Sequence, residues 1–481
     1  MSDVSGKAKK ATKWSLITEI SSKLVAPVVN MVLARVLTPE AFGMVATVTM
    51  VTSLADLFTD TGFQKFLIQH DFVDEDSLYK FANVAFWTNL FLSIFSWLLI
   101  FVFRNNIVAA IGNPGLGMAL AIASLALPMT SFSSIQTAFF RRKFDFKTLF
   151  WAKIIGIIIP IFVTVPLALI LKNFWAIIYG NLVVNLCNAI LLTWRSKWKP
   201  RFFFKFKMLK EMFAFSMWTF FEQLLGWANL NLGIFVVGLS LSTYYVGIYK
   251  TSMTTANQII AIFTNAFSPV LVSALSRLKE NQQEFNDFFY KFVKNTSIII
   301  LPLGVGMFIY RELLTSILLG SQWDEAADFI GLWALVRSFY IIFGFFAMEA
   351  FVSSGKPKYS VLSQFIGMLF LIPALAITSS QGYQTLFVTR SLLVIADAVV
   401  RLILLYRVLN ISAKNIICNV WPFLGASLVM GSFGFLFVLF FNSYIIQFVT
   451  CLLCVVIYFG ILLMFKCTRR QLLELVEVIK K

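Results

Sequence analysis

The stretch ARVLTPEAFG at residues 34–43 forms a short turn between two long apolar runs, at 14–36 and 42–67. A helix needs about twenty apolar residues to cross the hydrocarbon core of a bilayer, and each run is long enough. A connection this short makes two consecutive helices antiparallel neighbours. The stretch therefore predicts a pair of membrane-spanning helices, and the pattern recurs along the chain.

The composition makes the bilayer the only suitable solvent for this chain. Of the 481 residues, 59% are hydrophobic and only 13% are charged, whereas soluble domains carry about 25% charged residues. We predict an all-α membrane protein of about fourteen transmembrane helices without a large soluble domain. The expected spans are 14–36, 42–67, 80–103, 115–138, 148–171, 174–194, 212–238, 244–276, 295–319, 326–353, 359–379, 383–408, 417–441 and 443–465.

Positive charge is distributed unevenly between the loops. The formal net charge is +17, which in a soluble protein would indicate nucleic acid as a partner. Here Lys and Arg gather in alternate loops, such as 195–210 and 277–294, whereas the turns at 172–173 and 379–383 carry almost none. Cytoplasmic loops of membrane proteins show this excess. We therefore predict two cytoplasmic termini and no nucleic-acid partner.

The two halves of the chain align at an offset of about 204 residues. Leu37 then matches Leu241 and Gly43 matches Gly247, at the same place in the pattern of spans. Both copies begin on the same side of the membrane, which indicates a parallel repeat and two lobes around a central cavity. The expected parts are an N-terminal lobe at 1–208, a C-terminal lobe at 209–408, and two peripheral helices with an amphipathic cytoplasmic tail at 409–481.

Charged residues inside the spans are the candidate functional residues. A charge at mid-membrane costs about 2.5–3.5 kcal/mol, so it marks a cavity or an ion pair. Glu19 with Lys23 and Asp397 with Arg401 are spaced i, i+4, and each pair can neutralise itself within one helix. The candidates that lack such a same-helix partner are Asp56, Lys250, Arg337 and Arg390.

Three carboxylates are candidates for coupling transport to an ion. Asp56 and Asp60 are spaced i, i+4 on a face otherwise made of Thr and Ser, and Glu222 lies beside Gln223, which the repeat aligns with Glu19. Buried like charges favour binding of a proton or a sodium ion. The alternative is that Asp56 and Asp60 pair with cations of other spans.

Signatures of enzymes and metal sites are missing from the sequence. It contains no G-x-x-x-x-G-K-[ST], no G-x-S-x-G and no H-E-x-x-H. Cys451 and Cys454 form a C-x-x-C inside an apolar run, and His70 is the only histidine. We therefore expect no catalytic residue, no cofactor and no metal.

The opening turn carries a resemblance to a known family. The element Leu37-x-Pro39-x-x-Phe42-Gly43, its counterpart at 241–247 and a polar second span resemble the Wzx-type polysaccharide biosynthesis flippases. These are O-antigen, capsule and teichuronic-acid exporters of the multidrug/oligosaccharidyl-lipid/polysaccharide superfamily. Length, number of spans and duplicated halves extend the resemblance over nearly the whole chain.

The resemblance implies a transporter and its substrate. Proteins of this family turn undecaprenyl-diphosphate-linked oligosaccharides across the bacterial cytoplasmic membrane by alternating access of two lobes, and the polysaccharide polymerase machinery is a further expected partner. The family's cavity is cationic. The intramembrane cations that match this feature are Lys23, Lys250, Arg337 and Arg390.

Two other functions are compatible with the residues. A membrane glycosyltransferase or polymerase acting on the same lipid carrier would need a sizeable outer loop with catalytic groups, and the outer loops are only a few residues long. A multidrug antiporter of the same superfamily would suit an acidic core better than this basic one. The flippase is therefore the favoured function.

Overall fold

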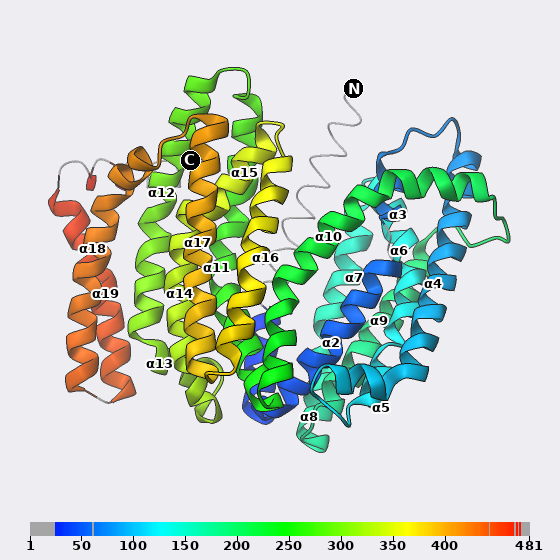
Figure 1. The fold of residues 1–481 in the computed structure, drawn as a ribbon, viewed down its shortest axis with the longest axis horizontal. Helices are drawn as coiled ribbons and strands as arrows, with labels where there is room; N and C mark the ends of the chain where they lie inside the picture. Colours follow the sequence, from blue (N-terminus) through cyan, green and yellow to red (C-terminus); the bar gives the residue numbers. More distant parts are fainter. Residues whose placement is uncertain (1–24, 60–61, 442, 466–467, 470, 473–481) are drawn as a thin grey trace. The chain divides into compact units, whose positions relative to one another are not determined.

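The chain is helical throughout the part that the structure describes. A computed structural model describes residues 25–59, 62–441, 443–465, 468–469 and 471–472, and these contain no β-strand. A spanning segment must satisfy its backbone hydrogen bonds internally, because hydrocarbon offers no partner, and a helix does so. The long apolar runs of the sequence therefore become helices, as Figure 1 shows.

The chain divides into two compact units, Met1–Gly247 and Ile248–Lys481. These units are defined by contacts, so they do not test the lobe boundary at 208/209, which was derived from the sequence repeat. That boundary stays a prediction. The described helices of the first unit are an apolar helix at Val25–Val36, α2 (Pro39–Thr59), α3 (Phe63–Gln69), α4 (Glu75–Ala110), α5 (Gly117–Ala123), α6 (Ala126–Arg142), α7 (Phe146–Ile159), the π-helix η1 (Pro160–Thr164), α8 (Val165–Leu171), α9 (Trp175–Arg195) and α10 (Phe206–Ser240).

The second unit takes up most of α11 and all later helices. Its elements are α11 (Thr243–Arg277), α12 (Gln282–Ile309), α13 (Arg311–Leu318), the 3-10 helix η2 (Ser321–Ala326), α14 (Ala327–Tyr340), the π-helix η3 (Ile341–Phe345), α15 (Phe346–Ser353), α16 (Lys358–Ser379), α17 (Tyr383–Leu409), α18 (Ala413–Phe440) and α19 (Tyr444–Met464). Large side chains of α12, such as Phe285 and Phe289, are fully buried against α18 in its core.

Twelve helices of the described residues are long and apolar enough to cross a membrane. Two expected spans lie outside that group. Span 14–36 is described only from Val25, and span 383–408 is α17, a helix of 27 residues that carries Arg390, Asp397 and Arg401. The multi-pass, all-α class is confirmed, and the count of fourteen stays a prediction. The expected amphipathic tail lies largely outside the described residues.

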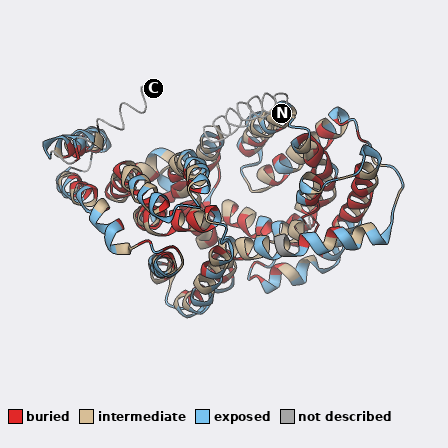
Figure 2. Ribbon diagram, turned by 90° about the horizontal axis from the view of Figure 1, so that it is seen from above, coloured by how far each residue is buried: buried red, intermediate tan, exposed pale blue. Residues whose placement is uncertain are grey.

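Each unit buries many of its small residues and turns many large apolar side chains outward. In Figure 2 the buried positions gather on the inward faces of the helices. Ile170 on α8 is 76% exposed and Ile445 on α19 is 78% exposed. A helix surface covered with such side chains is unfavourable in water, whereas it is compatible with contact with lipid.

Two glycines that the repeat aligns pack directly against each other. A Cβ on Gly43 would lie 1.9 Å from the Thr243 carbonyl oxygen, and a Cβ on Gly247 would lie 1.9 Å from the Pro39 carbonyl oxygen. Thr243 follows Pro39 by 204 residues, the same offset that separates the glycines. The contact is therefore reciprocal, like the self-complementary contact at a two-fold axis. Small residues allow this close approach of membrane helices.

The long expected span at 42–67 is interrupted. Helix α2 ends at Thr59, and Gly62 adopts a φ of 82° before α3 begins at Phe63. This left-handed conformation favours glycine. The end of α2 and the start of α3 therefore line the same cavity, through Thr59 and Gln64.

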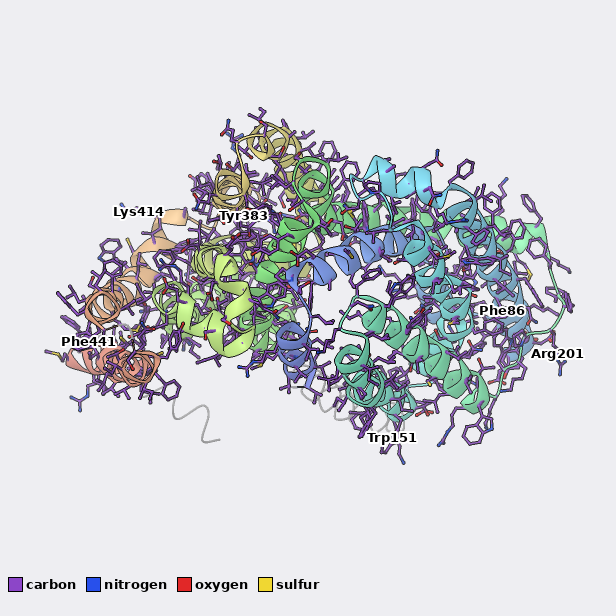
Figure 3. The ribbon with its side chains drawn as sticks, turned by 90° about the horizontal axis from the view of Figure 1, so that it is seen from below. Phe86, Trp151, Arg201, Tyr383, Lys414 and Phe441 are labelled. Atoms are coloured by element: carbon purple, nitrogen blue, oxygen red, sulfur yellow. The ribbon has the colours of Figure 1, made fainter. Side chains whose placement is uncertain are left out.

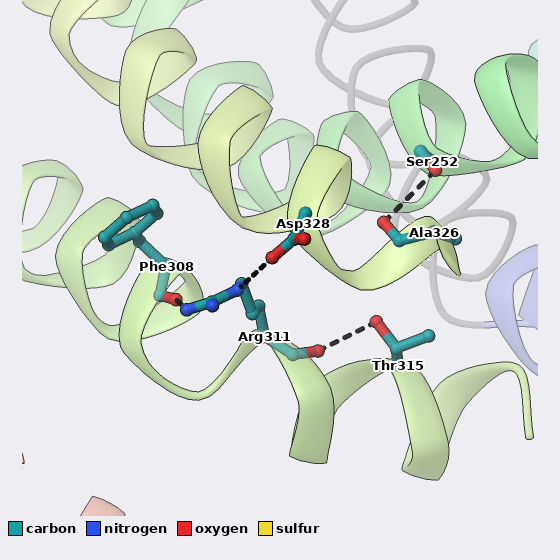
Figure 4. A network of polar contacts seen from close by, with 6 residues as sticks. All are labelled: Ser252, Phe308, Arg311, Thr315, Ala326 and Asp328. Atoms are coloured by element: carbon teal, nitrogen blue, oxygen red, sulfur yellow. Dashed lines mark hydrogen bonds and ion pairs between the residues drawn. The ribbon is translucent and has the colours of Figure 1, made fainter. Parts of the chain in front are cut away.

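The second unit has one basic end and one acidic end. At the basic end, Gln282 donates to the Leu409 carbonyl at 2.9 Å and Lys356 to the Val408 carbonyl at 3.1 Å, which brings three loops together. At the acidic end, Arg311 Nε donates to Asp328 at 2.7 Å in the network of Figure 4. The basic end carries Arg277, Lys279, Lys356, Lys358, Arg407 and Lys414, and the acidic end carries Glu312, Asp324, Glu325 and Asp328.

Several basic residues of the first unit lie together at one end. Arg142 Nη1 donates to the carbonyls of Leu67, Ile68 and His70, and Lys143 pairs with Glu75 at 3.0 Å. The basic loop at 196–205 joins the same end, where the Arg201 amide donates to Asn83. Arg201, like Lys414 of the second unit, is an exposed cation in Figure 3.

Candidate functional site

The second unit contains a cluster of arginines on two packed helices. Arg337 lies on α14, and Arg390 and Arg401 lie on α17, which packs against α14. Positions 390, 397 and 401 are separated by seven and four residues, so the helical period places them on one face of α17. We call Arg337, Arg390, Arg401 and Asp397 the arginine cluster.

Two aromatic rings of α14 hold the three guanidinium groups. The Arg390 Cζ lies 5.2 Å from the ring centroid of Trp333. The Cζ atoms of Arg337 and Arg401 lie 4.6 Å and 5.2 Å from the ring centroid of Tyr340. A guanidinium on an aromatic face gains about 2 kcal/mol when both groups are desolvated. Trp333 in turn donates its indole N–H to Asn257 Oδ1 at 3.1 Å, which fixes the ring.

The arginine cluster carries an excess of positive charge. Asp397 Oδ2 lies 3.0 Å from Arg401 Nη2 and is the carboxylate that the structure pairs with these guanidiniums in its described part. The remaining two guanidiniums have no ion pair among the described residues, although Arg390 lies beside the Tyr249 hydroxyl. Burying charge without a counter-ion is costly in hydrocarbon. The cluster is therefore suited to an anion.

Several polar atoms of the cluster lack a hydrogen bond. Arg390 is 8% exposed and Arg401 is 2% exposed. Within the described residues no partner reaches Arg390 Nε, Arg401 Nε, Arg401 Nη1 or Asp397 Oδ1. Buried polar atoms normally find partners, and a buried donor without one costs about 1–3 kcal/mol. The cluster thus has unused donors as well as unbalanced charge.

The other predicted cations do not join this cluster through any contact between described residues. Lys250 on α11 is half-buried and makes no ion pair or hydrogen bond in the described part of the chain. Lys23 lies outside the described residues. Of the four predicted cavity cations, the structure brings Arg337 and Arg390 together, and the sequence analysis treated Arg401 only as a partner of Asp397.

The first unit contains a polar cavity of about 130 Å³ around Asp56. Its walls come from α2, α3, α4 and α6, and its residues are Asp56, Thr59, Gln64, Asn89, Thr130, Ser131, Ser133, Ser134 and Thr137. Asp56 Oδ1 accepts hydrogen bonds from Thr130 at 3.1 Å and Thr59 at 3.4 Å. We call this space the Asp56 cavity.

Glu222, another predicted coupling residue, is not among the described residues that line this cavity. Asp60 lies outside the described residues. Glu222 on α10 is exposed and makes no ion pair or hydrogen bond with the part of the chain that the structure describes. The run Thr130-Ser131-Phe132-Ser133-Ser134 in an apolar span is the sequence signal that indicates the cavity wall.

An apolar helical bundle with charged and polar groups buried inside defines a multi-pass membrane protein. The chain belongs to the polysaccharide biosynthesis protein family, whose profile matches residues 32–328. This membership confirms the predicted family.

Curated bacterial relatives cover about two thirds or more of the chain. It is 23% identical over 337 residues to the succinoglycan biosynthesis transport protein ExoT of Rhizobium meliloti (strain 1021), covering 69% of this chain and 67% of that one. It is 22% identical over 336 residues to the lipopolysaccharide biosynthesis protein WzxC of Escherichia coli (strain K12), with the same coverage. An uncharacterized membrane protein in the cps region of Klebsiella pneumoniae is 21% identical over 375 residues, covering 77% and 76%.

Solved structures show the same fold at low sequence identity. The lipid II flippase MurJ in an inward closed conformation matches with a TM-score of 0.76 at 15% identity, covering 94% of this chain and 98% of that one. An inward-facing multidrug resistance MATE family transporter of the MOP superfamily matches with a TM-score of 0.61 at 11% identity, covering 81% and 94%. The predicted superfamily fold is confirmed.

Proposed function

We propose that this protein flips an undecaprenyl-diphosphate-linked oligosaccharide across the bacterial cytoplasmic membrane, and that the arginine cluster binds the diphosphate. The observation that carries the proposal is the excess of positive charge at the half-buried Arg337 and the buried Arg390 and Arg401. The name of one relative, the succinoglycan biosynthesis transport protein ExoT, and the fold shared with the lipid II flippase MurJ support export rather than synthesis. The polymerase machinery that consumes the flipped unit is a proposed partner.

The chemistry of the substrate explains why arginine is suitable. A diphosphate cannot enter hydrocarbon bare, because removing a charge from water costs several kcal/mol even after relaxation. Fixed donors must replace its water. The planar guanidinium presents a fork that matches phosphate oxygens, and it stays charged at any physiological pH. The unused N–H groups of Arg390 and Arg401 are such donors.

The cluster is also suited to release. Asp397 already neutralises part of the charge on Arg401, and the aromatic faces of Trp333 and Tyr340 stabilise the guanidiniums when no anion is bound. A transporter must bind its substrate weakly enough to let it go. The site therefore stays folded when no substrate is bound. Anion binding then contributes only a moderate binding free energy, so that the substrate can dissociate.

Alternating access is the proposed mechanism. The reciprocal contact of Gly43 and Gly247 follows the repeat offset of 204 residues, which supports a parallel duplication. Parallel repeats commonly rock against each other around a binding site. The substrate would then meet the arginine cluster from one side of the membrane and leave from the other.

The direct test is movement of a labelled substrate in liposomes. Undecaprenyl diphosphate linked to a fluorescent oligosaccharide is placed in one leaflet, and an impermeant quencher reports its arrival in the other. Arg390→Ala is expected to slow this movement about 10-fold or more, because it removes a charge-assisted contact of about 1.5–3 kcal/mol. Arg407→Ala is the matched control, since Arg407 is an exposed arginine of the same helix.

Three results would contradict the proposal. Wild-type rates in both Arg337→Ala and Arg390→Ala at normal abundance would exclude the arginine cluster. If the wild-type protein moves the labelled lipid in neither direction, flipping is excluded. A covalent product formed on the labelled lipid would assign the chain to the transferases or polymerases instead.

We place the basic ends of both units in the cytoplasm. The loops near Lys356 and Leu409 in the second unit, and near Arg142 and Arg201 in the first, collect the positive charge, as cytoplasmic loops do. In a variant without native cysteines, Gln381→Cys should react with an impermeant thiol reagent added outside the cell. Asn281→Cys should react only after the membrane is opened, and the reverse result would invert the topology.

A further inference from the structure

The Asp56 cavity has walls made almost entirely of oxygen atoms whose hydrogens are already used. Four hydroxyls of α6 donate to carbonyls of their own helix: Thr130 to Leu127, Ser131 to Pro128, Ser133 to Thr130, and Thr137 to Ser133, at 2.7–3.0 Å. A hydroxyl has one hydrogen and two lone pairs. These four hydroxyls therefore offer a ligand only acceptor lone pairs.

Asp56 adds negative charge to these acceptors. Its Oδ1 lies within hydrogen-bond distance of the Thr59 and Thr130 hydroxyls, and each of these single hydrogens is shared with a helix carbonyl. Its Oδ2 makes no hydrogen bond in the described part of the chain. No Lys or Arg is among the residues that line the cavity. A carboxylate in such surroundings needs a positive partner.

A second, independent observation comes from α4. Asn89 is 1% exposed and lines the cavity, and its amide oxygen has no hydrogen-bond partner among the described residues. Buried amide oxygens are normally satisfied. An unpartnered carbonyl-type oxygen, a carboxylate oxygen and several hydroxyl lone pairs meet in one cavity. Oxygen atoms of these types are the ligands that hard cations prefer.

We propose that the Asp56 cavity binds a sodium ion, held by Asp56, Asn89 and hydroxyls of α6. The cavity of about 130 Å³ has room for an ion and a few waters, since a water takes about 30 Å³ in the liquid. Asp56 is the one carboxylate among the described lining residues. A single negative charge balances a monovalent cation, whereas sites for divalent ions gather more carboxylates.

The interruption at Gly62 makes the site possible. Thr59 is the last residue of α2, and Gln64 lies in the first turn of α3. Both line the cavity, and Gln64 Nε2 donates to Ser134 Oγ at 2.9 Å. A continuous helix would carry positions 59 and 64 on different faces. The left-handed turn at Gly62 brings both to the cavity.

Under the proposed function, sodium binding would supply the energy for a directed cycle. That use rests on the flippase proposal, whereas ion binding does not. The test therefore measures binding alone, with Na⁺ itself as the probe and no lipid substrate. Failure of this test leaves substrate movement untouched, and failure of movement leaves ion binding untouched.

The experiment compares thermal stability of the purified full-length protein in detergent with NaCl or with choline chloride at equal ionic strength. Sodium is expected to raise the melting temperature of the wild-type protein in a saturable way, because a ligand that binds only the folded state stabilises it. Asp56→Asn should abolish the response, and Thr130→Val should raise the apparent Kd about 10-fold. Thr88→Val is the control, since Thr88 is a buried hydroxyl of α4 outside the cavity.

Two outcomes would overturn the proposal. A sodium response that persists in both Asp56→Asn and Thr130→Val would place the ion elsewhere. A wild-type protein that ignores sodium, but shows a pH-dependent melting temperature that Asp56→Asn removes, would make Asp56 a proton site instead. Radioactive ²²Na⁺ binding to the same variants keeps the test valid if Asp56→Asn lowers stability by itself.

Discussion

The Asp56 cavity of the first unit and the arginine cluster of the second are built on similar helices but offer opposite chemistry. Around Asp56, hydroxyl groups of α6 donate their hydrogens to helix carbonyls, and their oxygen lone pairs remain available to a ligand. Around Arg390 and Arg401, N–H donors remain without partners. A membrane helix satisfies its own backbone, so the side chains alone decide whether a site is complementary to a cation or to an anion.

The two sites are also stabilised differently. The cavity is held by short hydroxyl hydrogen bonds within α6 and by the Gln64 side chain, which donates to Ser134. The arginine cluster depends on aromatic faces and one ion pair. Loss of one residue should therefore change ligand affinity in the cavity, but it should change both affinity and stability in the cluster.

The largest expected effect separates the two sites by function. The double variant Arg337→Ala/Arg390→Ala should slow movement of the fluorescent lipid-linked oligosaccharide about 100-fold or more, because two charge-assisted contacts of about 1.5–3 kcal/mol each are lost. Its sodium-dependent gain in melting temperature should be unchanged. A double variant that loses the sodium response together with transport, while still folded, would show that the two sites are not separate.

The next effect concerns stability of the cluster. Arg401→Ala leaves Asp397 without the guanidinium 3.0 Å away, and breaking a buried pair in this way costs about 3–5 kcal/mol. We expect a large fall in the fraction of protein that stays monodisperse after heating, measured by size-exclusion chromatography. Adding Asp397→Ala should recover much of it, since the orphaned charge is removed. No recovery in the double variant would mean that Arg401 stabilises the fold through Tyr340 rather than through Asp397.

A smaller effect distinguishes charge from geometry at Arg337. Arg337→Lys keeps the positive charge but loses the planar fork and its stacking on Tyr340. Transport should fall about 3-fold in this variant and about 10-fold in Arg337→Ala, measured by initial rates in liposomes at matched protein amounts. Equal rates for the Lys and Ala variants would make the fork geometry decisive.

The smallest effect probes a single ligand of the Asp56 cavity. Ser133→Ala removes one hydroxyl that lines the cavity, and a neutral contact of this kind contributes about 0.5–1 kcal/mol. The apparent Kd for sodium should rise about 2-fold to 5-fold while the melting temperature without sodium stays the same. A Kd that does not move would remove Ser133 from the proposed ligands and narrow the site to Asp56, Asn89 and Thr130.

The sequence by itself determined the solvent and the secondary structure, and it predicts a repeat. Hydropathy and helical period are properties of the local sequence. A single segment in hydrocarbon can satisfy its own backbone hydrogen bonds only as a helix. Charged residues in the spans are rare enough to stand out, so Asp56, Arg337 and Arg390 were predicted as candidates from spacing alone. The offset of 204 residues that aligns Gly43 with Gly247 was likewise found from the amino-acid sequence.

Only the tertiary structure decided which of these residues meet. Arg401 looked neutralised by Asp397, yet the packing of α14 on α17 makes it a neighbour of Arg337 at the Tyr340 ring. Asn89 and Gln64 carried no signal, because polar amides in a span are ordinary until a cavity forms around them. The physical reason is that a binding site depends on contacts between helices, and neither hydropathy nor periodicity specifies which helix faces pack together.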